Sequence, residues 1–218
     1  MRFARREAEL APLGSRHEEG TTMANKQPAV TEQTKTNLRR AFWQLYEQKP
    51  IQKITVKQIT DLAGYNRGTF YLYFKDVYDL LEDIEDKVLE VIGGIMRDLL
   101  APDGPLGDAG QLRGAPGFQA AMTPLAQAVQ TYGSYARVLL SDRGDPAFKA
   151  RFKEIVWPPL KSTLPLKRAH CPKEERVTKE YCMAGLIAAI CAWLDEEDPL
   201  PVETFISLLS KDLVGSAS

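Results

Sequence analysis

Residues 55–81 read TVKQITDLAGYNRGTFYLYFKDVYDLL, and this stretch decides the fold. Its opening TVKQ is a capping-box pattern, in which the Thr55 hydroxyl accepts a backbone amide and the Gln58 side chain reaches back. Gly64 suits the left-handed backbone with which a helix ends, and Asn66 can cap the next helix. The stretch therefore predicts a short helix after Thr55, a turn at Gly64 and a second helix over 66–74.

The second of these helices has two faces. Phe70 and Phe74 are four residues apart, so they share a face that we expect to be buried. The opposite or flanking arc carries Arg67, Gly68, Tyr71, Leu72 and Lys75. An arginine can donate two hydrogen bonds to guanine or to phosphate, a tyrosine hydroxyl can reach phosphate, and a glycine lets the backbone approach. This face is typical of a helix that reads the major groove of DNA, although Tyr71 could also be an ordinary packing aromatic.

Two further amphipathic helices flank the stretch. Apolar residues recur with a helical period from Leu38 to Leu45, which predicts a helix over about 34–48, before Pro50. From Val77 to Leu99 the apolar positions keep a 3.6-residue period for six turns, which predicts one long helix. The helices before Val77 make a three-helix unit with a helix-turn-helix.

Charge is segregated along the chain, although the formal net charge is only −1. Residues 31–75 hold eight Lys and Arg against three acids, whereas residues 76–100 hold eight acids against two bases. A polyanion is attracted to the first segment and repelled by the second. This pattern favours double-stranded DNA as the partner of residues 31–75.

Over about residues 33–85 the sequence resembles the TetR family of bacterial transcription regulators, through the run TVKQITDLAGYNRGTFYLYFKDVYDLL. The resemblance implies that Thr55 contacts phosphate at the start of its helix. It implies contacts to bases or backbone for Tyr65, Asn66, Arg67, Gly68 and Thr69, and contacts to phosphate for Tyr71, Tyr73 and Lys75. Tyr73, like Tyr71, could instead be a packing aromatic. Val77 stands where many relatives have a basic residue, which implies one phosphate contact fewer per subunit.

The rest of the chain predicts further helices after a Gly- and Pro-rich linker at 101–117. We expect one helix from Phe118 through Val129, a second from Tyr135 that stops at Asp142, and a third that begins at Asp145-Pro146 and is ended or kinked at Pro158-Pro159. The last two helices are expected at 174–194 and 202–214. The fold class is therefore all-α, with no strand-like alternation.

The helix over Glu174–Leu194 is apolar on nearly every face after Tyr181, which requires neighbours on all sides. A second copy of the chain would supply them, because a monomer would expose a large apolar patch. The resemblance implies the same, since the family dimerises through its last two helices as a four-helix bundle. A homodimer predicts a pseudo-palindromic operator.

The resemblance also implies an effector pocket in the C-terminal half. Candidate lining residues are Phe118, Tyr132, Tyr135, Phe152, Trp157 and Tyr181. Each of them also fits an ordinary core. No buried charge, metal-ligand set or arginine pair identifies a ligand, so the effector stays unnamed and no metal or cofactor is expected.

Other classes of function find little support. The two histidines, His17 and His170, are isolated in polar segments, and no catalytic triad, phosphate-binding loop or carboxylate pair is present, so we expect no enzyme. The cysteines Cys171, Cys182 and Cys191 lack metal-binding spacing and are expected to be buried, inert thiols. The apolar run Tyr181–Leu194 is too short to cross a bilayer, so we expect no membrane anchor and a cytoplasmic protein.

These observations predict three segments: residues 1–30 as an arm or tag, residues 31–76 as a helix-turn-helix DNA-binding domain, and residues 77–218 as a helical dimerisation and effector-binding domain. Residues 1–22 fit a tag, an upstream start or a disordered arm. The expected function is that of a dimeric repressor released from DNA by an effector. The alternative is a co-regulator, or helical interaction protein, that responds to a partner protein.

Overall fold

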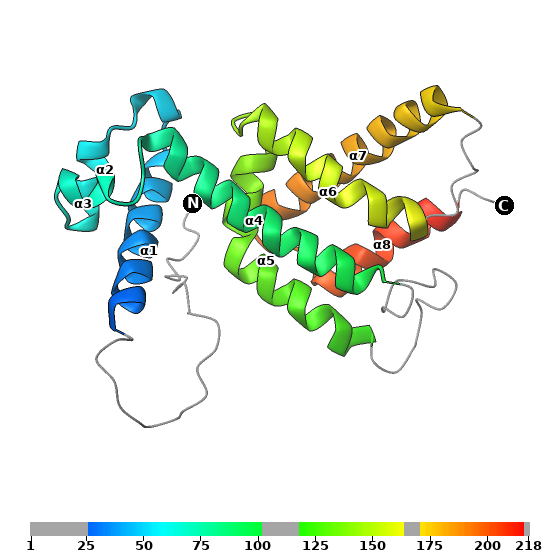
Figure 1. Ribbon diagram of the computed structural model, residues 1–218. Coiled ribbons are helices and arrows are strands. Elements are labelled where there is room, and N and C mark those ends of the chain that lie inside the picture. Colours follow the sequence, from blue (N-terminus) through cyan, green and yellow to red (C-terminus); the bar gives the residue numbers. More distant parts are fainter. Residues whose placement is uncertain (1–25, 102–117, 164–170, 216–218) are drawn as a thin grey trace. The chain divides into compact units, whose positions relative to one another are not determined.

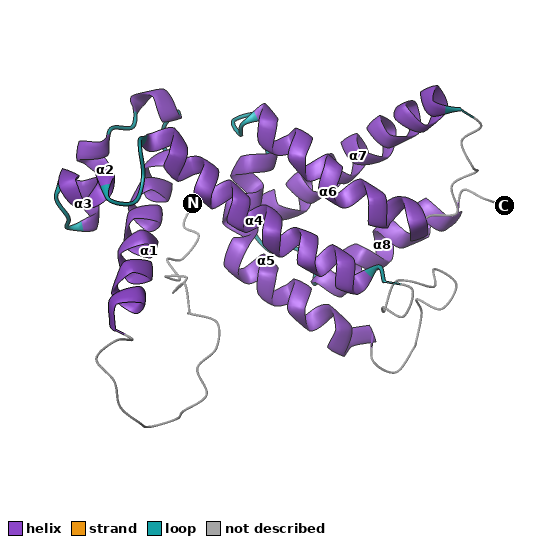
Figure 2. Ribbon diagram, in the orientation of Figure 1, coloured by secondary structure: helices purple, strands orange, loops and turns teal. Residues whose placement is uncertain are grey.

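The computed structural model describes residues 26–101, 118–163 and 171–215, and within them it contains helices and no strand, as Figure 1 and Figure 2 show. The helices are α1 (Lys26–Tyr46), the single 3-10 turn η2 (Ile51–Lys53), α2 (Val56–Ala63), α3 (Arg67–Tyr71), α4 (Val77–Leu99), α5 (Phe118–Leu140), α6 (Pro146–Thr163), α7 (Pro172–Asp195) and α8 (Val202–Gly215). The predicted all-α class is confirmed. Residues 1–22, His170 and most of the expected linker at 101–117 lie outside the described residues.

The chain divides into two compact units, and the division falls inside α4. One unit extends through Asp86 and the other begins at Lys87, so the first turns of α4 belong with α1–α3 and the remaining turns with α5–α8. The domain boundary predicted at residue 76 lies at the start of α4, before this division. The long helix predicted from Val77 to Leu99 has these same ends in the structure.

The N-terminal unit is organised around large side chains that α1, α2 and α3 bury together. Phe42 from α1, Ile59 from α2 and Phe70 from α3 are completely buried, and Leu80 from the first turns of α4 is too. The Phe70 and Phe74 rings lie 5.7 Å apart, centroid to centroid. Both phenylalanines are therefore scaffold, as their spacing predicts.

The predicted helix ends within this unit are confirmed at three residues. The Thr55 hydroxyl accepts the Gln58 amide at 3.3 Å while the Gln58 side chain accepts the Thr55 amide at 3.1 Å, so the capping box is complete. Gly64 ends α2 in the left-handed conformation, with a φ of 75°. The Asn66 side chain accepts the Thr69 amide at the start of α3.

Two helix lengths in this unit differ from prediction. α1 begins at Lys26 instead of about Thr34, because a helix can extend beyond the residues that carry its apolar pattern. Within the added turns, the Thr34 hydroxyl donates to the Val30 carbonyl at 2.9 Å. α3 ends at Tyr71 instead of Phe74. The reason lies in the next helix, since the Asp76 carboxylate accepts the amides of Tyr78 and Asp79 and caps α4.

An ion pair joins α1 to the first turns of α4. Arg39 donates from Nε and a terminal nitrogen to the two carboxylate oxygens of Asp83, at 2.5 and 3.1 Å. A bidentate pair of this kind fixes orientation as well as distance. Because Arg39 is buried in this pair, one of the eight basic residues counted between 31 and 75 serves the core and not the surface.

The C-terminal unit corrects the prediction of two helices between Phe118 and Asp142. α5 is a single helix that continues through Pro124 and ends at Leu140. The apolar pattern breaks at Gly133, and a Cβ atom there would lie 3.5 Å from a Leu194 methyl group. Leu194 of α7 thus packs in ordinary contact at Gly133, and α5 continues through the break in its apolar pattern.

Of the two outcomes predicted at Pro158-Pro159, an end and a kink, the end is wrong, because α6 continues through both prolines to Thr163. Each proline lacks one amide donor and would normally end the helix here. Phe152, Val156 and Trp157 are buried on the same helix. Burial of large side chains contributes about 1.5–3 kcal/mol each, which offsets much of the cost of the prolines. The predicted start is confirmed, since Asp145 accepts the Ala147 amide at 2.8 Å.

Charged side chains bind the first half of α7 to α6. Lys153 pairs with Glu180 at 2.5 Å, Lys161 with Glu175 at 2.5 Å and Lys179 with Glu154 at 2.6 Å. The hydrogen bond from Lys161 lowers the pKa of Glu175, and that from Lys153 lowers the pKa of Glu180. Among the described helices α7 alone has the length and hydropathy of a membrane span. These ion pairs favour a helix that packs against protein.

The cysteines differ partly from prediction. All three are free thiols, but Cys171 is exposed, while Cys182 and Cys191 are half-buried on α7. Burial raises the pKa of the Cys182 thiol, and it is also the main cause of the raised pKa of Cys191. Raised pKa values keep both groups in the unreactive thiol form at neutral pH. The expectation of a buried thiol is wrong for Cys171, which precedes the first turn of α7.

We predict opposite effects on stability for alanine at two glycines. A Cβ atom at Gly64 meets no atom within 4 Å, so the cost of Gly64→Ala is that of the left-handed backbone, about 1 kcal/mol. Gly94 lies inside α4 and also has open space, so Gly94→Ala should stabilise by about 0.5–1 kcal/mol. Urea denaturation followed by circular dichroism measures both. Equal effects at the two positions would contradict the prediction.

Candidate functional site

α3 and the turn after it present a continuous exposed surface. Arg67 and Gly68 are exposed at the start of α3, and Tyr71 is 58% exposed at its end. Leu72 follows and is 77% exposed, and Lys75 is exposed too. Phe70 points the other way into the core. We call Arg67, Gly68, Tyr71, Leu72 and Lys75 the reading surface. It is the surface that the helical spacing predicts.

The start of α3 is held by one side-chain cap. The Asn66 amide oxygen accepts the Thr69 backbone amide at 2.8 Å and the Thr69 hydroxyl at 3.2 Å. A Cβ atom at Gly68 would lie 3.1 Å from that same oxygen, which is closer than most real Cβ contacts. Gly68 therefore protects the cap as well as leaving space for a partner. The side-chain oxygen of Asn66 is thus used within the helix, whereas the NH₂ group of the same side chain can donate to DNA.

Thr55 has a comparable double role at the start of α2. Its oxygen accepts the Gln58 amide, while its hydroxyl hydrogen can still be donated to an acceptor such as phosphate. Gln58 in turn accepts a hydrogen bond from the Lys49 ammonium at 3.0 Å. The capping box thus places a basic side chain beside the exposed Thr55.

Two of the predicted DNA-contacting residues are tied to α1. The Asn37 side-chain amide donates to the Tyr65 hydroxyl at 3.0 Å, and the Lys35 ammonium lies 6.0 Å from the centre of the Tyr73 ring. Tyr65, Tyr73 and Thr69 are each half-buried. Sequence reasoning missed Asn37 and Lys35, because their partners lie 28 and 38 positions further along the chain and no local pattern joins them. The two residues position the surface around α3.

The ion pairs show which cations remain available to a partner. Arg39 is paired with Asp83, Lys57 with Asp61 at 2.7 Å, and Lys35 with Glu32 at 3.5 Å. Within the described residues, Arg67 and Lys75 form no ion pair and both are exposed. Val77 is buried and belongs to the core. The positive charge of this surface is therefore concentrated on two side chains that flank Tyr71.

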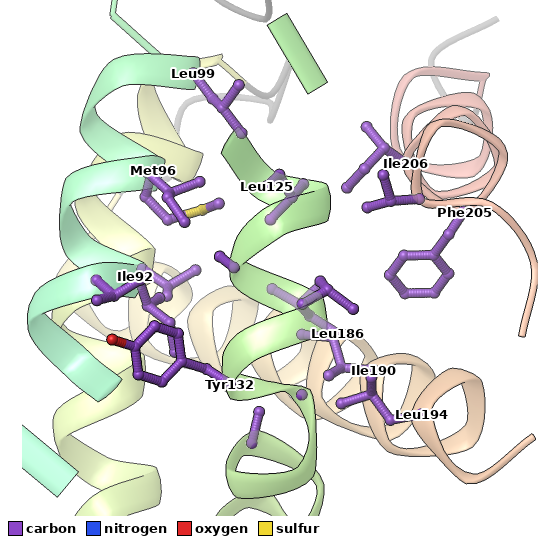
Figure 3. Close-up of a pocket in the computed structure, with 18 of the residues that line it drawn as sticks. Ile92, Met96, Leu99, Leu125, Tyr132, Leu186, Ile190, Leu194, Phe205 and Ile206 are labelled. Atoms are coloured by element: carbon purple, nitrogen blue, oxygen red, sulfur yellow. The ribbon is translucent and has the colours of Figure 1, made fainter. Parts of the chain in front are cut away.

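The C-terminal unit contains a cavity of about 230 Å³. Helices α4 to α8 all contribute to its wall, and Figure 3 shows Ile92 and Met96 of α4, Leu125 and Tyr132 of α5, Leu186 and Ile190 of α7 and Phe205 of α8 around it. Among the residues that the structure describes, none that lines the cavity is charged. Protein interiors rarely leave voids larger than a water molecule, so a space of this size is a candidate binding site.

The structure brings together two of the six residues predicted for an effector pocket. Tyr132 and Phe152 line the cavity. The Tyr135 ring is tilted against the Tyr132 ring, with centres 6.3 Å apart, but Tyr135 does not line the cavity. Trp157 is buried and does not line it either. Tyr181 is 80% exposed, and the Phe118 side chain lies outside the described residues. Most of the lining is aliphatic, which sequence reasoning overlooked by searching for aromatic residues.

No cluster that could bind a metal is found in the described parts of the chain, where no three His, Cys, Asp or Glu side chains gather. The site chemistry therefore consists of an exposed, partly cationic helix in one unit and an apolar cavity in the other.

Comparison with known proteins agrees with the geometry of the N-terminal unit. Residues 38–84 match the family described as "Bacterial regulatory proteins, tetR family". An uncharacterized HTH-type transcriptional regulator of Bacillus subtilis (strain 168), YxbF, is 31% identical over 69 residues, which are 32% of this chain and 18% of that protein. The chain thus spans less than a fifth of that relative.

Likeness to a solved structure extends to the whole fold. The TetR transcriptional regulator from Streptococcus agalactiae 2603V aligns with a TM-score of 0.57 and 21% identity, covering 88% of this chain and 99% of that one. The agreement includes the all-helical unit after α4, for which identity at this level shows the fold alone. Over residues 38–84, with its capped helix-turn-helix, the chain carries the N-terminal domain of the tetR family of bacterial regulatory proteins.

Proposed function

We propose that the protein represses transcription as a homodimer that binds a pseudo-palindromic operator and leaves it when an effector occupies the C-terminal cavity. The reading surface on α3 carries the proposal, because its exposed residues combine two cations, a tyrosine hydroxyl and a glycine on a helix that is capped and anchored from behind. Since the partner is chromosomal DNA, the protein acts in the cytoplasm.

On DNA, α3 enters the major groove and the residues around it contact the backbone. Arg67 is at the first turn of α3, where a guanidinium can donate two hydrogen bonds to a guanine edge. Thr69, Tyr65 and the Asn66 NH₂ group lie next to it along the chain and contact bases or backbone. Thr55, Tyr71, Tyr73 and Lys75 contact phosphates, which fix the register of the helix. Buried Val77 makes no such contact.

Dimerisation is proposed through α7 and α8, and exposed apolar residues on α7 support it. Val177 and Tyr181 are 66% and 80% exposed, and Ala184, Ala188 and Ala192 continue the same line at helical spacing. We call these five residues the α7 stripe. On α8, Leu208 is also exposed. A stripe of this kind is stable in water when another apolar surface covers it, and a two-fold dimer covers it with its own copy.

Release by an effector rests on α4, because its first turns belong to one compact unit and its later turns to the other. Its first turns contribute Leu80, Leu81 and Ile84 to the core of the DNA-binding unit, and its later turns contribute Val88, Ile92 and Met96 to the cavity wall. An effector that binds one arrangement of α4 more tightly shifts the population towards that arrangement. A regulator that responded only to a partner protein would not require the cavity, so the cavity favours a small molecule.

Substitutions on the reading surface should weaken DNA binding in two distinguishable ways. Arg67→Ala should cost about 1–3 kcal/mol and relax specificity at one base position, because it removes a contact to a base edge. Lys75→Ala should weaken binding to all sequences and reduce the slope of log K against log [salt] by about one per subunit. Fluorescence anisotropy with DNA from upstream of the gene, over a salt series, measures both effects.

Arg97→Ala is the matched control, since Arg97 is an exposed cation in the last turn of α4 and outside the DNA-binding unit. It should leave binding unchanged. An absence of binding at low salt, or full binding by the Arg67→Ala, Tyr71→Ala double variant, would overturn the proposed reading surface.

A charge on the α7 stripe should separate the subunits. Ala184→Arg with Ala188→Arg places two cations where the proposed interface is apolar, and burying unpaired charge should weaken the dimer at least about 100-fold. Ala150→Arg, on an exposed position of α6, is the control and should leave the dimer intact. Sedimentation equilibrium measures association, and circular dichroism verifies folding. A wild-type monomer at tens of micromolar protein contradicts the proposal.

A further inference from the structure

The chemistry of the cavity wall restricts what can bind there. Of the described residues that line it, only Tyr132 and Trp193 carry a polar side-chain atom, and every other one is aliphatic, phenylalanine, methionine, alanine or glycine. All but Leu100 belong to helices, and away from the helix ends the backbone amides and carbonyls bond to each other. The amide of Leu100 also donates to the Met96 carbonyl. The backbone therefore offers a ligand almost no hydrogen bonds.

The two polar side chains are not equivalent. The Trp193 indole N–H donates to the Leu200 carbonyl at 2.8 Å, and its ring stacks on Phe205 with centres 4.4 Å apart. Its donor is thus already used inside the protein. The Tyr132 hydroxyl forms no hydrogen bond within the described residues and lies on the α4 side of the cavity in Figure 3. Of the two side chains, Tyr132 therefore has the hydroxyl that can hydrogen bond to a polar atom of a ligand.

Charge on a ligand would find no partner in this wall. Transfer of an ion from water to an apolar site is strongly unfavourable unless a counter-charge or several hydrogen bonds compensate. Charged residues next to the lining are paired elsewhere: Lys153, beside Phe152, pairs with Glu180, and Asp195, beside Leu194, pairs with Arg137 at 3.7 Å. The wall therefore selects against carboxylates, phosphates and ammonium groups.

The cavity is also distinct from the surface proposed for dimerisation. The α7 residues in its wall are Leu186, Ile190, Trp193 and Leu194, and none of them belongs to the α7 stripe. On α8, exposed Leu208 is absent from the wall, which takes Phe205 and Ile206 instead. A second copy that covers the stripe would leave the cavity available. The occupant that fits is a small molecule.

Volume sets the size of that molecule. An apolar cavity of about 150 Å³ stays dry and accepts benzene, so a cavity of about 230 Å³ accommodates roughly ten non-hydrogen atoms. Resting on the proposed effector-responsive function, we propose that the cavity binds an uncharged, mainly hydrocarbon molecule of this size, with at most one hydroxyl or carbonyl oxygen, which hydrogen bonds to Tyr132. Charged metabolites and sugars are excluded as effectors of this site.

Three probes with the same eight-carbon chain test the inference on the full-length protein: 1-octanol, octanoate and octylammonium. Isothermal titration calorimetry should show saturable binding of 1-octanol and at least about tenfold weaker binding of both ions, because their charge has no partner in the wall. Octanoate or octylammonium binding as tightly as 1-octanol would overturn the inference. So would the absence of 1-octanol binding at its solubility limit.

Two variants assign the binding to this cavity. Tyr132→Phe should weaken 1-octanol about two- to tenfold, the effect of one net hydrogen bond. Ala128→Leu fills part of the cavity and should weaken 1-octanol more strongly, whereas Ala150→Leu makes the same change on the exposed face of α6 and should have no effect. Equal binding by Ala128→Leu and Ala150→Leu would place the probe elsewhere and refute the site.

A separate measurement distinguishes this inference from the proposed function. DNA affinity with and without saturating 1-octanol reports whether occupancy of the cavity is coupled to the reading surface. If 1-octanol binds with the predicted selectivity and DNA affinity does not change, the ligand class stands and release by an effector fails. If DNA is not bound at all while the probe selectivity holds, the operator proposal alone fails.

Discussion

A helix of five residues has almost no stability of its own in water, because nucleating a helical turn costs more than one or two hydrogen bonds return. α3 is such a helix, and the DNA-binding surface depends on it. Two interactions hold it in place: the Asn66 cap at its start and the burial of Phe70, which packs with Phe74 inside the three-helix unit. With one side of α3 buried and its first turn capped, the other side keeps a fixed orientation.

The same principle applies to the tyrosines around α3. Asn37 and Lys35 of α1 contact Tyr65 and Tyr73 at long range, so two residues that we propose to meet DNA are supported from another helix. The Arg39–Asp83 pair then joins α1 to the first turns of α4. Arg39 thus fixes the unit, and the exposed positive charge lies on Arg40, Arg67, Lys75 and several lysines.

α7 shows how one apolar sequence serves two surfaces. Residues such as Ile190 and Leu194 line the cavity, while Tyr181 and Ala188 face solvent. Ion pairs bind the first half of the helix to α6. A helix that is apolar all round would otherwise resemble a membrane span. Its two faces explain the composition without a membrane, because protein covers one face and the proposed partner subunit covers the other.

Local pattern by itself determined the helix-turn-helix, its caps at Thr55, Gly64 and Asn66, the buried pair Phe70 and Phe74, and the bounds of α4, because each depends on residues within one or two helical turns. Tertiary structure alone decided the rest. α5 continues through Gly133, where Leu194 packs against it, and α6 continues past two prolines because Phe152 and Trp157 are buried. α3 ends early because Asp76 caps the next helix. The cavity wall likewise takes residues from five helices, and its aliphatic composition has no local signature. Packing between distant segments is a property of three-dimensional contact, which a linear pattern does not contain.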